Sequence, residues 1–409
     1  MACTSGKSTP NTWRRMCFLL IVSSATAFAP ARRFSCRNRK PLSHDVLISD
    51  NRRQPSRKCR PRTGDSSSSG DRSSPDYALG DCARDYVSIL RPATILQAVG
   101  ALVVGHLTLQ PKRSIPTLMT PSILFAALSV YLSYGAGMVM NDVVDAAIDA
   151  GGRQNQIATD GGDKLKLSKA DRPLASGRIS RQAGWTYCFV LSASALWLAG
   201  CASATVAFAS AAGAISYRFV WWTAGNMAIM LGYALGLQCI LLIKNILCGW
   251  LAISPLIGAA CLVAEGCTGV LSGSGFSSLL APDLPVVSKL YLLAAVGFTM
   301  QVAREILKDA EDVDIDQGNK ITLPMVIGTP ASKRLAYNLV ASVIMMMVLT
   351  PYYWKIFYSH PPVYLIGVLF GFPMCIWASK LQLREGHQLL KKSMHVLLAS
   401  MIGALLLQR

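Results

Sequence analysis

Residues 119–149 read MTPSILFAALSVYLSYGAGMVMNDVVDAAID. The first part of this stretch is uncharged and apolar, and about 20 such residues are enough to cross the hydrocarbon core of a bilayer. Asp142, Asp145 and Asp149 follow at spacings of i, i+3 and i+7, which place three carboxylates on one face of a helix. The stretch therefore predicts a membrane-crossing helix that ends in a row of carboxylates.

A second stretch repeats this pattern. The apolar run 288–308 is followed by Asp309, Asp312 and Asp316, again at i, i+3 and i+7. Carboxylates at a membrane boundary are energetically costly and usually functional. A solvated acidic loop is the other interpretation of either motif alone. Two such rows facing each other would repel unless cations lay between them, so the pair of motifs predicts a cation site between two helix ends.

The composition also indicates a membrane protein. Hydrophobic residues make up 52 % of the 409 residues and charged ones 15 %, whereas soluble domains carry about 25 % charged residues. The run 182–217 is too long for one ordinary crossing at about 1.5 Å per residue. Hydropathy alone therefore leaves open whether the chain crosses the membrane about nine or ten times. The expected fold class is an all-α integral membrane protein, a bundle of about nine transmembrane helices. The candidate spans are 93–110, 119–141, 182–217, 219–243, 245–264, 288–308, 335–354, 356–379 and 393–408.

The beginning of the chain predicts a two-part leader ahead of a membrane domain at 77–409. Residues 1–27 have the basic start, short apolar stretch and Ala-Thr-Ala ending of a signal peptide. Residues 28–76 are rich in Arg and Ser, as transit peptides and disordered leaders are. The Ala-Thr-Ala-Phe-Ala-Pro junction resembles the bipartite plastid presequences of algae. We expect the protein to reside in a plastid (chloroplast) membrane, and the alternative locations are the mitochondrial inner membrane or an endomembrane. The alternative interpretation of the leader itself is a simple secretory signal followed by a disordered tail.

The net charge of +18 does not indicate nucleic-acid binding. Residues 1–76 hold 15 Lys/Arg and 5 Asp, so +10 of this charge lies in the leader. The remainder lies mostly in loops between apolar runs, where positive charge marks the inner side of a membrane and attracts anionic ligands. The 12 cysteines show no metal-site spacing, so neither disulfides nor zinc are expected.

The two aspartate motifs suit Mg²⁺. This ion takes oxygen ligands from carboxylates, waters and substrate phosphates, so it can bridge the motifs to a diphosphate. It would neutralise charge on the departing pyrophosphate, while apolar helices would keep water from the carbocation left behind. Lys169, Arg172 and Arg178 follow the first motif and are candidates for diphosphate contacts. Positive charge that sets membrane topology is the other interpretation of each.

These residues resemble the UbiA superfamily of membrane prenyltransferases. The family motif N-D-x-x-D-x-x-x-D is matched at 141–149, D-R-P-x-x-S-G-R-I at 171–179, and D-x-x-D-x-x-x-D at 309–316. The likeness covers about residues 85–408. The chain departs from the pattern in a longer loop after the first motif and in Asp314-Ile, where many members have Glu-Gly.

The resemblance implies a nine-helix bundle, Mg²⁺ as cofactor, a polyprenyl diphosphate donor and usually an aromatic acceptor. Asp145 and Asp309 are the expected catalytic residues. The implied metal ligands are Asn141, Asp142, Asp145, Asp149, Asp309, Asp312 and Asp316. Because both motifs must share one membrane face, an even number of crossings must separate them. The region 182–264 is therefore expected to cross three times.

The predicted function is Mg²⁺-dependent transfer of an isoprenyl group from a geranylgeranyl- or phytyl-type diphosphate to a small acceptor. Plastid targeting favours an aromatic quinone, tocopherol or chlorophyll precursor. The run 304–309 (REILKD) most resembles members that alkylate a geranylgeranylglycerol phosphate, which is the alternative. A cation- or proton-coupled transporter is the alternative from another class, but no internal repeat is visible and the acids lie at helix ends. The expected partners are the donor, the acceptor and the lipid bilayer, without nucleic acid.

Overall fold

The computed structural model describes residues 75–109, 115–157, 172–209, 217–266, 285–313, 320–354 and 361–407. Within these ranges all regular secondary structure is helical, as the expected fold class requires. The predicted signal peptide 1–27 and almost all of the leader 28–76 lie outside the described residues.

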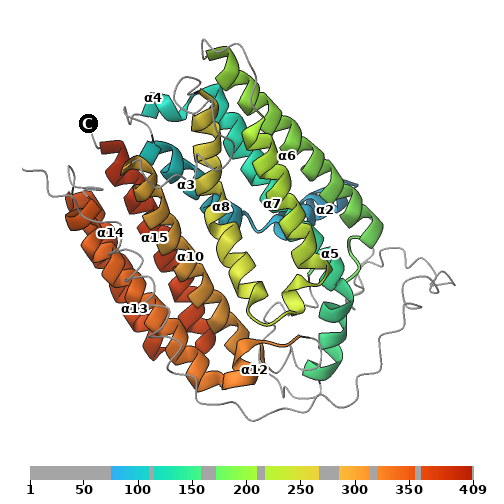
Figure 1. The fold of residues 1–409 in the computed structure, drawn as a ribbon. Coiled ribbons are helices and arrows are strands. Elements are labelled where there is room, and N and C mark those ends of the chain that lie inside the picture. Colours follow the sequence, from blue (N-terminus) through green and yellow to red (C-terminus); the bar gives the residue numbers. More distant parts are fainter. Residues whose placement is uncertain are drawn as a thin grey trace, which may run out of the picture. The chain divides into compact units, whose positions relative to one another are not determined.

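Nine long helices form the described bundle (Figure 1). Eight of them are long and apolar enough to cross a membrane. The ninth, α7, carries Arg218 and Asn226 and packs against α5, α6 and α8. The long helices are α3 (Pro92–Leu109), α5 (Pro121–Ile157), α6 (Arg181–Ala209), α7 (Arg218–Leu235), α8 (Ile243–Gly266), α10 (Pro285–Glu311), α13 (Thr329–Trp354), α14 (Pro361–Lys380) and α15 (Leu383–Leu407). The short ones are α2 (Pro75–Leu90), α4 (Ile115–Leu118), η3 (Leu237–Cys239) and α12 (Leu323–Ile327).

The connection between the two aspartate motifs has the expected parity. The run 182–217 contributes one helix, α6, which ends at Ala209. Helices α6, α7 and α8 therefore lie between α5 and α10 in the described chain. With α10 itself, the chain passes along the bundle four times between the motifs, so the end of α5 and the end of α10 come to the same side (Figure 1).

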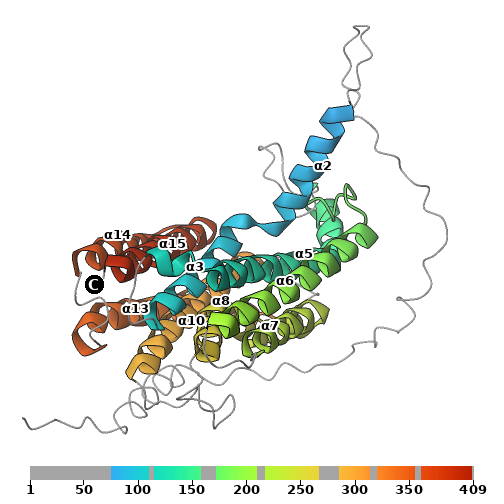
Figure 2. The same cartoon turned by 90° about the horizontal axis from the view of Figure 1, so that it is seen from above.

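Apolar packing divides the bundle into neighbouring groups of helices. Helix α5 packs mainly on α6, α3 on α8, α14 on α15, and α10 on both α8 and α13. Figure 2 shows α13, α14 and α15 on one side of α10, with α5, α6 and α7 on the other. Helix α10 thus occupies the middle of the bundle, and its buried Leu292, Ile306 and Leu307 contribute to the largest apolar core.

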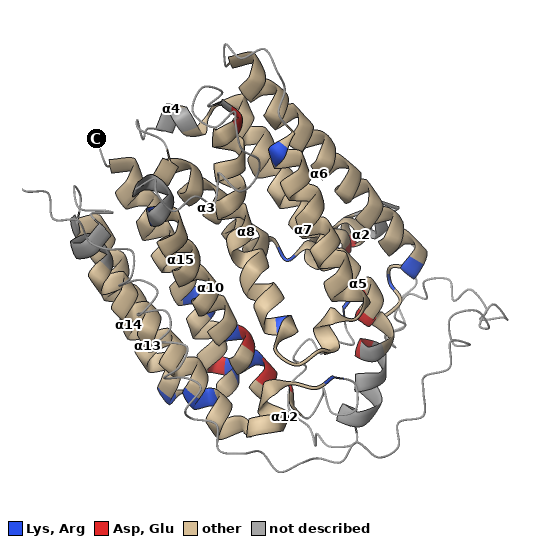
Figure 3. Ribbon diagram, in the orientation of Figure 1, with Lys and Arg blue, Asp and Glu red and all other residues tan. Residues whose placement is uncertain are grey.

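The outer surface of the bundle is apolar. Large side chains are exposed there, among them Phe189, Trp197, Phe208, Trp221 and Phe370. A soluble protein rarely exposes so many large apolar side chains, whereas lipid tails solvate them without cost. Charged residues gather instead at helix ends, notably at the end of α10 near α12 (Figure 3). The chain is therefore a multi-pass membrane protein.

Close contact between α3 and α8 depends on Gly105. A methyl group added at Gly105 would lie 2.5 Å from the carbonyl oxygen of Leu256 and 3.0 Å from the Cβ of Ala259. Small residues at such positions let membrane helices approach closely.

We predict that Gly105→Ala lowers the free energy of unfolding by about 1–3 kcal/mol, because the two backbones must move apart. The measurement is the midpoint of thermal unfolding in detergent. Gly200→Ala in α6 is the matched control, because a methyl group there meets nothing within 4 Å. Equal midpoints for the two variants would contradict the close contact.

Candidate active site

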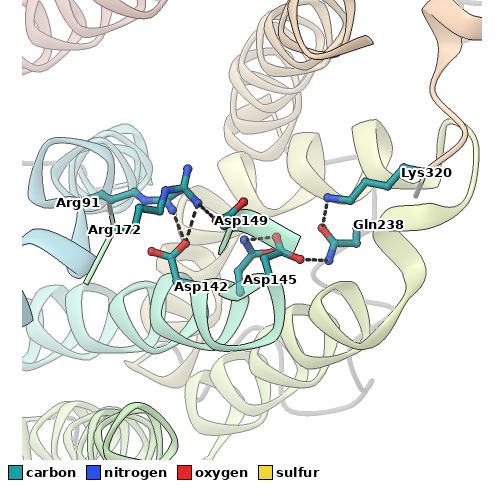
Figure 4. A network of polar contacts seen from close by, with 8 residues as sticks. Arg91, Asp142, Asp145, Asp149, Arg172, Gln238 and Lys320 are labelled. Atoms are coloured by element: carbon teal, nitrogen blue, oxygen red, sulfur yellow. Dashed lines mark hydrogen bonds and ion pairs between the residues drawn. The ribbon is translucent and has the colours of Figure 1, made fainter. Parts of the chain in front are cut away.

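The first aspartate motif forms a buried carboxylate face at the end of α5. Asp142 and Asp145 are only 4 % and 8 % exposed. Asn141 Nδ2 donates to Asp145 Oδ2 at 3.1 Å, and Gln238 Nε2 donates to Asp145 Oδ1 at 3.1 Å (Figure 4). The buried Oδ1 of Asn141 has no hydrogen-bond partner among the described residues. An oxygen acceptor is thus left open beside two carboxylates.

Two arginines from other segments bind this face. Arg91, at the joint between α2 and α3, forms an ion pair with Asp142 Oδ1. Arg172 Nη1 lies 3.3 Å from Asp142 Oδ1 and 2.8 Å from Asp149 Oδ2. Burial lowers the pKa of the Arg91 guanidinium, and the carboxylate of Asp142 opposes this shift. Arginine nevertheless stays protonated in proteins, so both side chains bring positive charge to the motif (Figure 4).

The backbone at Arg91 is held in an uncommon conformation. Its φ of 53° lies in the left-handed region, which non-glycine residues visit at a cost of order 1 kcal/mol or more. Pro92 begins α3 directly afterwards, and a residue before proline is restricted further. The ion pair with Asp142 is one interaction that favours this sharp joint.

The second aspartate motif begins with a fully buried carboxylate. Asp309 is 0 % exposed and pairs with the ammonium of Lys244, at the start of α8. Asn245 Nδ2 donates to its other oxygen at 3.2 Å. Asp312 follows at the end of α10, half-buried, with its backbone N–H bonded to the carbonyl of Lys308 at 3.0 Å. The motif therefore meets α8 through a cation and an amide.

The two motifs face a common region. Gln238 in η3, which binds Asp145, also accepts a hydrogen bond from Lys320 Nζ at 3.2 Å (Figure 4). Lys320 lies in the segment that follows the second motif. The charge of Lys308 acts on Asp142 across the same region. The end of α5 and the end of α10 thus contribute to one polar region.

The described residues include most of the predicted site. The structure gathers Asn141, Asp142, Asp145, Asp149 and Arg172 on α5 and its following turn. Asp309 lies on α10, and Asp312 follows its last residue, Glu311. Lys169 and Asp316 lie outside the described residues, so their roles stay predictions.

Arg178 is placed differently from the other predicted cations. Its Nε and Nη2 lie 2.7 Å and 3.1 Å from the carboxylate of Asp85 in α2. This bidentate pair ties the turn after the first motif to α2. Arg178 is 48 % exposed, and its proposed diphosphate contact stays a prediction.

Four site residues were not proposed as ligands from the sequence: Arg91, Gln238, Lys244 and Lys320. Lys244 had a usable signal, because it is a lone cation between apolar runs and such residues are usually functional. Gln238 had a weaker signal of the same kind. Arg91 precedes Pro92, and nothing local in the sequence marks its contact with Asp142.

The donor set suits a hard divalent cation. All candidate ligands offer oxygen, and the open Oδ1 of Asn141 adds a neutral oxygen to the carboxylates, which matches what Mg²⁺ prefers. Within the described residues no three acids already form a metal-ligand group. Arg91, Arg172 and Lys244 instead hold the carboxylates.

A match to the model of the UbiA prenyltransferase family extends over residues 98–401. The chain belongs to the UbiA prenyltransferase family. It is 28 % identical over 277 residues to the digeranylgeranylglyceryl phosphate synthase of Methanoculleus marisnigri, covering 67 % of this chain and 79 % of that protein. It is also 28 % identical over 320 residues to the enzyme of the same name from Natronomonas pharaonis, covering 76 % and 93 %.

The fold is shared with a solved UbiA homologue. The structure of a homologue from Archaeoglobus fulgidus bound to DMAPP and Mg²⁺ matches 79 % of this chain and 99 % of its own, with a TM-score of 0.51 and 16 % identity. As a UbiA prenyltransferase, the chain is an enzyme that transfers a prenyl group. This finding excludes the transporter alternative.

The buried pair of Lys244 and Asp309 gives a test of the second motif. We predict that Lys244→Met destabilises the UbiA fold by about 3–5 kcal/mol, because it leaves a buried carboxylate without its cation. The double variant Lys244→Met/Asp309→Asn should recover most of that loss. The measurement is thermal unfolding in detergent with EDTA, so that no metal ion replaces the lysine.

Lys392→Met is the control for this cycle, since Lys392 is exposed on α15 and its loss should leave the unfolding midpoint unchanged. Additive losses from Lys244→Met and Asp309→Asn would show that the two side chains do not stabilise each other.

Proposed function

We propose that this protein transfers a geranylgeranyl group from geranylgeranyl diphosphate to the free glycerol hydroxyl of a geranylgeranylglyceryl phosphate, forming an ether lipid. The observation that carries the proposal is the likeness to digeranylgeranylglyceryl phosphate synthases over 67 % and 76 % of the chain. The product named for those relatives contains two geranylgeranyl groups on one glyceryl phosphate. The last bond made in such a product joins a prenyl carbon to a glycerol oxygen.

The proposed reaction breaks one C–O bond and forms another. The C1–O bond of the donor breaks, and its electron pair leaves with pyrophosphate. The hydroxyl oxygen of the acceptor forms the new C–O bond to C1 and loses its proton to the medium. The step needs stabilisation of the leaving pyrophosphate and exclusion of water from the allylic cation.

The site residues support both needs. Asn141, Asp142, Asp145 and Asp309 would hold Mg²⁺, which supplies positive charge for the pyrophosphate when bound. Arg172 is positioned to exchange its contact with Asp149 for a phosphate oxygen, since its planar guanidinium suits bidentate phosphate contacts. The apolar bundle behind the motifs would enclose the prenyl chain and exclude water.

The competing proposal is an aromatic acceptor, which plastid targeting by the leader would favour. The named relatives are archaeal, so the proposed plastid membrane depends on residues 1–76 alone. An aromatic acceptor, expected from plastid targeting, has no support among these relatives. Both the run 304–309 and the names of the relatives favour a glyceryl phosphate acceptor.

We predict that membranes containing the full chain transfer radiolabelled geranylgeranyl groups to geranylgeranylglyceryl phosphate. Asp145→Ala and Asp309→Ala should each lower the rate by about 100-fold or more, the size of loss expected when a stabiliser of transition-state charge is removed. Asp81→Asn, on an exposed part of α2, is the control and should retain full activity. Transfer to homogentisate, a naphthoate or a chlorophyllide, with none to the glyceryl phosphate, would overturn the proposal.

We also predict that the reaction depends on a divalent cation. EDTA should abolish transfer, and excess Mg²⁺ should restore it, because the carboxylates alone would repel the diphosphate. The test compares rates at fixed pH with EDTA, with added Mg²⁺ and with added Ca²⁺. Activity that persists in EDTA would contradict the two-motif metal site.

A further inference from the structure

A second cluster of charged residues lies beside the aspartate motifs. Helices α3, α10 and α15 pack on one another. Arg304 and Lys308 lie one turn apart on α10, and His387 and Lys391 lie one turn apart on α15. We call these four residues the cationic cluster. They belong to helices that qualify as membrane spans, where charged side chains are costly and usually functional.

The cluster has more positive charge than its described contacts neutralise. Lys391 Nζ donates to the neutral hydroxyl of Thr94 at 2.9 Å. The ammonium of Lys308 makes no hydrogen bond or ion pair within the described part of the chain. Arg304 binds Glu305 through Nη1 at 2.8 Å, but its buried Nε has no hydrogen-bond partner there. Donors therefore remain for an additional acceptor.

The acids near the cluster are already engaged. Glu305 is buried against Arg304 and Gln301. Glu311 lies 2.7 Å from His387 Nδ1 and 3.9 Å from Arg384. Each of these carboxylates has its own partner.

Repulsion within the cluster favours a bound anion. The positive charges of Arg304, Arg91 and Lys308 all act on Lys391, and the negative charge of Glu305 acts in the opposite direction. Three cations held near a fourth raise one another's energy, most strongly where water is scarce. A phosphate that carries two negative charges would relieve this repulsion and accept the unused donors of Lys308, Lys391 and Arg304.

The cluster is next to the reacting end of the site. Arg91 forms an ion pair with Asp142 and also acts on Lys391. Lys308 acts on Asp142 and directly precedes Asp309 in the chain. A phosphate bound here would thus lie beside the aspartate motifs without occupying them. The donor diphosphate, held by metal and Arg172 at those motifs, would leave this position to a different phosphate.

We infer that the cationic cluster, with Thr94, binds the phosphate monoester of the acceptor and so directs its free hydroxyl toward the donor. This inference rests on the proposed function, which supplies an acceptor that carries a phosphate. Lys391 is then a specificity-determining residue, because an aromatic acceptor without a phosphate would make no ionic contact with its ammonium group.

The test measures steady-state kinetics of the full chain in membranes for Lys391→Gln, Lys391→Arg and Lys392→Gln. Lys391→Gln should raise the KM for geranylgeranylglyceryl phosphate by about 10- to 100-fold, the usual worth of a hydrogen bond to a charged group. The KM for geranylgeranyl diphosphate should not change. Lys391→Arg should retain most of the affinity, and Lys392→Gln, which removes an exposed charge one residue away, should match the wild type.

A dephosphorylated acceptor, geranylgeranylglycerol, completes the design. The wild type should use it poorly, and Lys391→Gln should use it no worse than the wild type does. If the wild type uses the glyceryl phosphate but Lys391→Gln leaves its KM unchanged, or raises the KM for the donor instead, the cluster is not the acceptor phosphate site, and the proposed function stands. If the wild type transfers nothing to the glyceryl phosphate, both the proposed function and this inference fail.

Discussion

Everything at the polar end of this bundle depends on burying carboxylates next to cations from other helices. Asp142, Asp145 and Asp309 are nearly or fully buried in membrane helices. Removing an ionised carboxylate from water costs several kcal/mol unless it is paired and hydrogen-bonded. Arg91, Gln238 and Lys244 supply that pairing, so the positions of α3, η3 and α8 are tied to the aspartates of α5 and α10. The polar contacts thus fix which helices meet, while the apolar core fixes how closely they pack.

This dependence explains which parts of the site can be read from sequence. Asp142, Asp145 and Asp149 share a face because of helical periodicity, which is local and visible in the spacing. The meeting of Asp309 with Lys244 is different, because those residues come from separate helices and no periodicity relates them. The common side of the two motifs was implied by the family resemblance, and the even number of passes between them was derived from it. Sequence reasoning therefore reached the motifs and their common side, but not the partners that hold them.

The same contrast appears in the fold. Long apolar runs predicted most of the helices, because crossing a membrane imposes a length and a composition. The run 182–217 was ambiguous because apolar residues continue beyond the end of α6 at Ala209. The run 219–243 was predicted as one span, whereas the structure ends α7 at Leu235 and begins η3 at Leu237. Helix α7 carries Arg218 and Asn226 and is not one of the eight candidate spans, yet it packs within the bundle. Two hydrogen bonds join it to α8: Phe219 N–H donates to Glu265, and Trp250 Nε1 donates to Asn226 Oδ1.

Helix α10 connects the second aspartate motif with the cationic cluster through its own geometry. Residues 305 and 309 lie one turn apart, as do 304 and 308, and the two pairs are offset by a single residue. One residue is about 100° of rotation on a helix of about 3.6 residues per turn. The helix therefore turns Asp309 toward Lys244 of α8, while the charges of Arg304 and Lys308 act on Lys391 of α15. One helix thus brings a carboxylate of the second motif and basic side chains to the same end of the bundle, which is what the proposed reaction between two phosphate-bearing lipids requires.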